Sequence, residues 1–124
     1  MADTSVSRFF GDAQRTLCLT PPMILELEKQ TGAGIGSLFR RMLAGEFHHG
    51  DMVQTIRLAL IGGGATPKDA ASLTATYATE RPIGEVYPLA VEILDALYSG
   101  TPAEKFDVDK LRADIAEAFE SGAE

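Results

Sequence analysis

The residues of this chain that could do chemistry are few, and their spacing does not favour catalysis. His48 and His49 are the only histidines. Adjacent positions on a helix point about 100 degrees apart, so these two rings cannot share a metal ion as an i, i+4 pair can. On a loop, Glu46 and Asp51 would have to complete the ligand set, and an exposed turn is the simpler interpretation.

Other patterns that resemble functional motifs lack their essential parts. Glu26 and Glu28 lie two positions apart on a predicted helix, where they do not face each other. The glycines at 62–64 have a predicted helix on each side, whereas a phosphate-binding loop follows a strand and ends in Gly-Lys-Ser or Gly-Lys-Thr. We interpret them as a flexible connection between helices. No serine lies in a Gly-x-Ser-x-Gly pattern. We therefore predict no enzyme activity, no cofactor and no metal.

Size and charge limit the partners. The 124 residues, 45% of them hydrophobic, suffice for one core. A net charge of -7 repels phosphate backbones and anionic lipids, so neither nucleic acid nor a membrane is expected as a partner. Cys18, the single cysteine, lies in an alternating apolar run and is expected to be a buried thiol. With no signal-like leader and no span of about 20 apolar residues, we expect a cytoplasmic protein.

The periodicity of apolar residues predicts two strands followed by helices. The strands, about 5–10 and 15–20, flank a turn at Gly11–Gln14. Thr20, Asp51 and Thr66 are candidate N-caps, and Gly32 and Gly45 are placed to end helices. Pro88 requires that the helix around it begins nearby or kinks. One apolar helix face is expected at Ile35, Leu38, Phe39, Met42 and Leu43. We expect helices at 21–30, 35–43 and 51–61, one starting at 67, one starting near Glu85 or kinked at Pro88 and ending at Gly100, and one starting at Asp107.

The predicted fold is therefore mainly α with a short N-terminal β-hairpin (α+β), arranged as a compact bundle of five to six helices. Residues 1–100 form the hairpin and the helical body. Residues 101–124 form an acidic C-terminal helix that extends the same domain. Residues 103–124 contain seven acids and three bases, so 3 - 7 = -4 of the net charge lies there.

Several segments, in this order and spacing, resemble a known family. They are Leu17-Cys18-Leu19-Thr20, Leu25-Glu26-Leu27-Glu28, Ile35-Gly36-Ser37-Leu38 and Leu58-Ala59-Leu60-Ile61-Gly62-Gly63-Gly64. The resemblance is to small tail-assembly proteins that are encoded among the tail genes of phages and gene transfer agents. Relatives are labelled either tail tube protein or tail assembly chaperone. A tube subunit typically needs many strands, so the helical pattern favours the chaperone label.

The resemblance implies a non-catalytic chaperone that binds the tape measure protein, assists assembly of the tail tube protein, and is absent from the mature particle. Self-association is compatible with it. The main alternative is a structural tube or connector subunit that stays in the particle. A weaker alternative is a helix-turn-helix regulator that presents Phe39–Met42 and Arg57 to DNA. The predicted protein-binding residues are on the hairpin edge and on one helical stripe: Leu17, Leu19, Val108, Leu111, Ile115 and Phe119.

Overall fold

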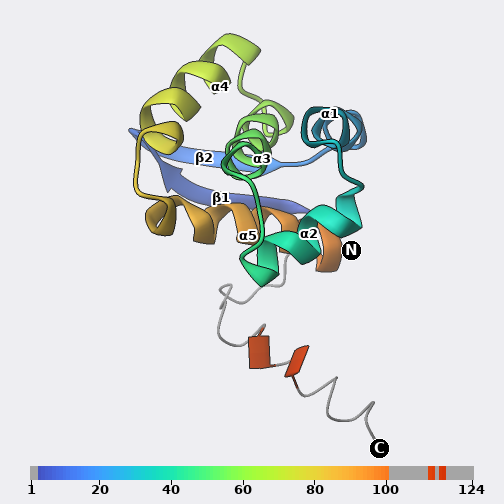
Figure 1. The fold of residues 1–124 in the computed structure, drawn as a ribbon. Coiled ribbons are helices and arrows are strands. Elements are labelled where there is room, and N and C mark those ends of the chain that lie inside the picture. Colours follow the sequence, from blue (N-terminus) through green and yellow to red (C-terminus); the bar gives the residue numbers. More distant parts are fainter. Residues whose placement is uncertain (1–2, 101–111, 114, 117–124) are drawn as a thin grey trace, which may run out of the picture.

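The structure is a computed structural model, and it describes residues 3–100, 112, 113, 115 and 116. A β-hairpin precedes a set of helices (Figure 1). The elements are β1 (Ser5–Phe10), β2 (Ala13–Cys18), α1 (Pro21–Thr31), α2 (Ile35–Ala44), α3 (His49–Gly62), α4 (Pro67–Thr74), the π-helical turn η1 (Ala75–Thr79) and α5 (Ile83–Ser99). The predicted α+β class, with one N-terminal hairpin and about five helices, is confirmed.

The hairpin is tighter than predicted. Its turn is only Gly11 and Asp12, because Gly11 adopts a φ of 73°, which a residue without a Cβ reaches at little cost. β2 therefore starts at Ala13 and pairs antiparallel with β1 from Phe10↔Ala13 to Ser5↔Cys18. The chain leaves the strand before Thr20, which becomes the N-cap residue of α1.

α3 is the central helix of the molecule. It packs against β2, α1, α4 and α5. Its side chains are buried on most sides, as expected for a helix that is apolar all round. Its fully buried residues meet those of the hairpin and α5 in one core, whose largest members include Leu17, Leu19, Leu27, Leu38, Met42, Met52, Ile56, Leu58, Leu60, Ile93 and Leu94.

The start of α3 differs from the prediction. Asp51 is not the N-cap residue but lies in the first turn, three residues after His48. Its carboxylate accepts a hydrogen bond from the backbone N–H of His48 at 2.9 Å and pairs with Arg41 at 2.7 Å. Asp51 is 2% exposed. This carboxylate therefore both caps α3 and ties it to the end of α2.

The segment after α3 combines a predicted and an unpredicted feature. The predicted cap is present, since the backbone N–H of Asp69 donates to the Thr66 hydroxyl at 3.1 Å. The single helix expected from residue 67 instead changes from α-helix to a π-helical turn at Ala75. α5 begins at Ile83, two residues before the expected start near Glu85, and it continues through Pro88.

The end of α3 lies against the backbone of β2. A Cβ at Gly62 would overlap the carbonyl oxygen of Cys18, and one at Gly63 would overlap that of Thr16. Neither glycine has a positive φ, so a side chain is excluded by contact and not by backbone conformation. The interpretation of these two glycines as a flexible connection is therefore wrong, and they are close-packing positions.

Candidate functional site

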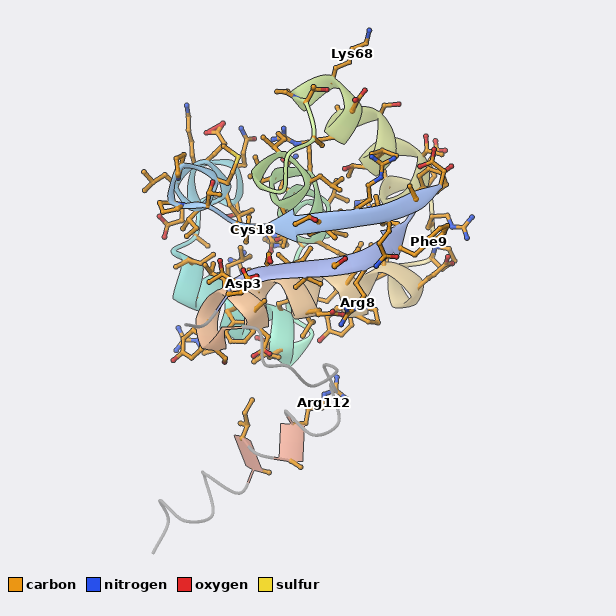
Figure 2. All side chains as sticks on the ribbon, turned by 180° about the vertical axis from the view of Figure 1, so that it is seen from behind. Asp3, Arg8, Phe9, Cys18, Lys68 and Arg112 are labelled. Carbon is orange, nitrogen blue, oxygen red and sulfur yellow. The ribbon has the colours of Figure 1, made fainter. Side chains whose placement is uncertain are left out.

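In the described part of the chain, no helix covers the outer face of the hairpin. Figure 2 shows the molecule from that side, with both strands in front of the helical layer. Burial alternates along both strands, so Val6, Phe10 and Leu17 point into the core. The exposed residues of the other side, Ser7, Phe9, Gln14 and Thr16, form what we call the open hairpin face. Phe9 is 68% exposed, which is unusual for a large apolar side chain.

The two edges of the hairpin have different neighbours. In a hairpin with a two-residue turn, Thr16 and Cys18 fall in non-hydrogen-bonded pairs, so their backbone groups point away from β1. These are the carbonyls that Gly62 and Gly63 approach, and α3 therefore covers the β2 edge.

The edge of β1 carries its own local partners. By the same register, the backbone groups of Ser5, Ser7 and Phe9 point away from β2. The Ser5 N–H donates to the Asp3 carboxylate at 2.9 Å, and the Ser7 carbonyl accepts from the Arg8 guanidinium at 2.6 Å. In the described residues β1 pairs with β2 alone. Side chains thus form hydrogen bonds with some of the backbone groups at this edge, and another strand could pair with the same groups.

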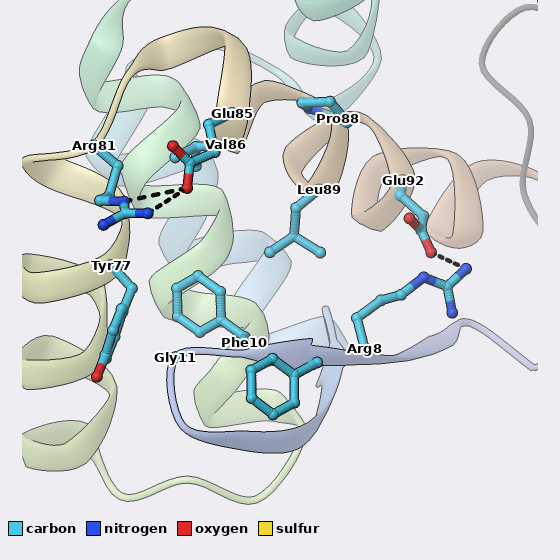
Figure 3. Close-up of a pocket in the computed structure, with 11 residues that line it drawn as sticks. Arg8, Phe10, Gly11, Tyr77, Arg81, Glu85, Val86, Pro88, Leu89 and Glu92 are labelled. Atoms are coloured by element: carbon cyan, nitrogen blue, oxygen red, sulfur yellow. Dashed lines mark hydrogen bonds and ion pairs between the residues drawn. The ribbon is translucent and has the colours of Figure 1, made fainter.

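A pocket lies where the hairpin turn meets η1 and α5 (Figure 3). It has a volume of about 460 Å³. Its lining is Arg8, Phe9, Phe10, Gly11, Tyr77, Arg81, Glu85, Val86, Pro88, Leu89 and Glu92. The ring of Tyr77 lies edge-on to that of Phe10, with centroids 6.0 Å apart, and leaves no room for a side chain at Gly11.

The charges of this pocket neutralise each other. Arg8 pairs with Glu92, and Arg81 pairs with Glu85 at 2.6 Å. The hydrogen bond from Arg81 to Glu85 raises the pKa of the guanidinium. The arrangement joins the hairpin and η1 to α5, and it supplies neither an activated nucleophile nor an unpaired acid and base.

A second concave surface runs between α2 and α5 and is more apolar. We call it the α2–α5 groove. It encloses about 880 Å³ and is lined by Gly36, Ser37, Phe39, Arg40, Leu43, Ala44, Tyr98, Arg112 and Ile115. The rings of Phe39 and Tyr98 contact each other with centroids 5.3 Å apart. Tyr98 is nevertheless 76% exposed, so the groove presents aromatic surface to its surroundings.

The predicted binding residues are distributed over three environments. Leu17 and Leu19 are 0% and 1% exposed and belong to the core, so their side chains are not on the surface. Ile115 is half-buried and lines the α2–α5 groove. Val108, Leu111 and Phe119 lie outside the described residues. The binding role of all six stays a prediction. The exposed Phe9 was missed because the sequence pattern did not determine which residues of β1 face the core and which face outward.

Cys18 and the histidines occupy other surroundings. Cys18 is half-buried on the outer side of the hairpin, with its sulfur 3.5 Å from the Thr4 hydroxyl. The prediction of a core thiol is wrong because the apolar partners of the strand, Leu17 and Leu19, face the opposite side. His48 and His49 are exposed at the start of α3. The described residues contain no group of His, Cys, Asp and Glu that could hold a metal ion.

The face suggested for DNA is engaged within the protein. Met42 is fully buried, and Arg41 is held by Asp51. Arg57 donates to Gln54 at 2.8 Å. A recognition helix would need this face to be free. In the described part of the chain, no helix is both long and apolar enough to cross a bilayer.

A strand edge with local partners and an apolar groove are typical of proteins that assemble with other polypeptides. Comparison with known proteins gives the family. The chain belongs to the phage tail tube protein family, GTA-gp10, whose model matches residues 3–100. No curated protein and no solved structure matches it significantly. The expected relation to phage and gene transfer agent tails is confirmed at the level of the family.

The family description corrects the functional prediction. It names a tail tube protein, so the chaperone interpretation is wrong and the alternative of a structural subunit is supported. The error came from requiring many strands within one chain. Subunits can also build sheets between them, and for that each needs only an edge strand. Association with other tail components and with further copies follows from the family.

Proposed function

We propose that this chain is a non-catalytic structural subunit of a phage-type tail, a tube or connector component that binds a second copy of itself through β1. The family match over residues 3–100 carries the proposal. The hairpin supports it, because the β2 edge is covered by α3 while β1 pairs with no third strand among the described residues. The tape measure protein remains a predicted additional partner.

A strand that adds beside β1 would replace the side-chain hydrogen bonds at this edge by backbone hydrogen bonds between the two strands. Beside β1, its backbone would replace the Asp3 carboxylate at Ser5 and the Arg8 guanidinium at Ser7. The hydrogen bonds from Ser5 to the Asp3 carboxylate hold the pKa of this exposed acid below its usual value, so near neutral pH it is a charged, exchangeable cap. Phe9 would gain burial against the arriving chain.

The first test uses the particle. Mass spectrometry of purified tail particles should find this chain in abundant, stoichiometric copies. The prediction that the chain leaves the finished particle is tested by the same measurement. Absence from washed, complete particles would contradict a structural role.

The second test uses a matched pair of variants. Phe9 and Leu25 are both 68% exposed, but Phe9 is on the open hairpin face and Leu25 is on α1. Phe9→Glu should reduce self-association at least tenfold by sedimentation velocity, since burying a Phe contributes roughly 1.5–3 kcal/mol. Leu25→Glu should leave it unchanged. Equal effects of the two variants would argue against β1 as the contact.

A third variant tests the backbone. Ser7→Pro removes an N–H that points away from β2, which a hairpin tolerates better than loss of an inward N–H. Ser7→Thr keeps the N–H and is the control. The proline variant should fold, as judged by circular dichroism, and fail to associate. A folded proline variant that associates normally would exclude strand addition at this edge.

A further inference from the structure

We propose that the α2–α5 groove is the docking site of this chain's own acidic C-terminal segment, residues 101–124, which covers the groove by its apolar stripe. The segment lies beyond the region that the family model matches, residues 3–100. The proposal therefore goes beyond the function proposed above and does not depend on it.

The first argument is the position of the described residues of this segment. Arg112 and Ile115 both line the groove, opposite Phe39 and Leu43 of α2. Ile115 is half-buried, whereas Ala116, the next residue, is exposed. At these two positions Ile115 is thus turned toward the groove and Ala116 away from it.

The second argument is the match between the stripe and the groove. Val108, Leu111, Ile115 and Phe119 recur at helical spacing, so on a helix they would share one side. The groove offers the rings of Phe39 and Tyr98 together with Leu43. Its volume of about 880 Å³, which Arg112 and Ile115 already bound in part, leaves room for further apolar side chains of the stripe. Tyr98, which is 76% exposed, is the surface that closer docking would bury.

The third argument is charge and reach. Arg40 is exposed at the groove, and residues 103–124 carry a net charge of -4. α5 ends at Ser99, one residue after Tyr98, so the chain enters the segment beside the groove. The 11 residues at 101–111 can span roughly 35 Å when extended, which suffices for the segment to return to α2. A docked segment would keep aromatic surface from making unspecific contacts.

Cross-linking in the full chain tests the proposal. Cys18→Ser removes the native thiol, and Ala44→Cys with Arg112→Cys places one thiol on each side of the groove. A short bismaleimide should link them within one chain. The product should run as a monomer on a denaturing gel, with a yield that does not depend on protein concentration. The control pair is Leu25→Cys with Arg112→Cys, because Leu25 is exposed on α1 and does not line the groove.

Point variants in the same assay identify the contact. Ile115→Asp should slow the internal link roughly fivefold, because a half-buried apolar side chain is lost. Ala116→Asp adds the same charge at an exposed neighbouring position and should have little effect. Arg40→Glu should slow the link at low salt, and added salt should reduce the difference. The helical content of all variants, measured by circular dichroism, should equal that of the parent.

Three results would overturn the proposal. One is a yield equal to that of the Leu25 control pair. Another is a product that is mainly a cross-linked dimer, which would assign the groove to the segment of a second copy. The last is an equal effect of Ile115→Asp and Ala116→Asp, which would show that the apolar stripe does not hold the segment in the groove. None of these outcomes would contradict association through β1, so the two proposals fail separately.

Discussion

Replacing Gly62 or Gly63 by alanine should destabilise the protein, against the usual trend for helices. In an open helical position, Gly→Ala stabilises by roughly 1 kcal/mol because alanine has the higher helix propensity. At these two positions the new Cβ would overlap a carbonyl oxygen of β2. The obstacle is backbone, so no side-chain rotation can relieve it, and α3 must move away from the strand.

The expected magnitude follows from the two opposing effects. Overpacking of this kind costs about 1–3 kcal/mol, and the movement of α3 also disturbs the buried contacts that Leu58 and Leu60 make near its end. After the propensity gain of about 1 kcal/mol is subtracted, overpacking alone lowers the unfolding free energy of each variant by up to about 2 kcal/mol, and the disturbed contacts add to this loss. For a domain of this size that is a large share of a total of about 5–15 kcal/mol.

Urea denaturation followed by circular dichroism measures the effect. Gly36→Ala in α2 and Gly50→Ala in α3 are matched controls, since nothing lies within 4 Å of a Cβ built at either glycine. Both controls should leave the unfolding free energy equal or slightly higher. If Gly63→Ala were as stable as Gly36→Ala, the close approach of α3 to β2 would be refuted, and with it the statement that α3 covers the β2 edge.

Three further predictions concern polar groups that are buried or half-buried. Asp51→Ala should lower the unfolding free energy by about 3 kcal/mol in urea denaturation, because it leaves Arg41 without its carboxylate and removes the cap of α3; a loss below about 0.5 kcal/mol, typical of surface substitutions, would contradict this. Burial raises the pKa of Asp95, so its charged form opposes folding, and Asp95→Asn should raise the urea midpoint at pH 7, with the gain shrinking as pH falls through the raised pKa; a gain that does not change with pH would contradict it. Tyr87→Phe should cost about 1 kcal/mol by the same method, since the Tyr87 hydroxyl donates to the Met42 carbonyl at 2.6 Å, and an unchanged midpoint would show that this hydrogen bond contributes nothing.

Local signals of the sequence were sufficient for most of the fold. Gly32 and Gly45 end helices with φ values of 71° and 75°, as their positions predict. Thr66 caps α4 as its spacing from Asp69 indicates. The apolar spacing in α2 gives the correct buried face, with Leu38 and Met42 at 0% exposure. Each of these depends on residues within one or two turns of each other, which is why the sequence predicts them.

What the sequence did not predict depends on contacts between distant segments. The requirement for Gly62 and Gly63 comes from β2, more than 40 residues earlier in the chain. The burial of Asp51 depends on Arg41 from another helix. The burial of Leu17 and Leu19 depends on which side of the hairpin the helices pack. Period-2 alternation separates the two sides of a strand but does not say which one faces the core.

The same distinction explains how a mainly helical chain fits a tail tube family. The number of strands in one chain indicates only the sheet that this chain can complete alone. A subunit can instead contribute an edge strand to a sheet that it shares with a neighbouring subunit. Here α3 covers one edge of the hairpin at Gly62 and Gly63, so within the described residues the strand edge left for pairing is that of β1. Two copies that each offer only β1 would pair β1 against β1 as a closed two-fold dimer, so growth beyond a dimer requires a second contact surface on the subunit.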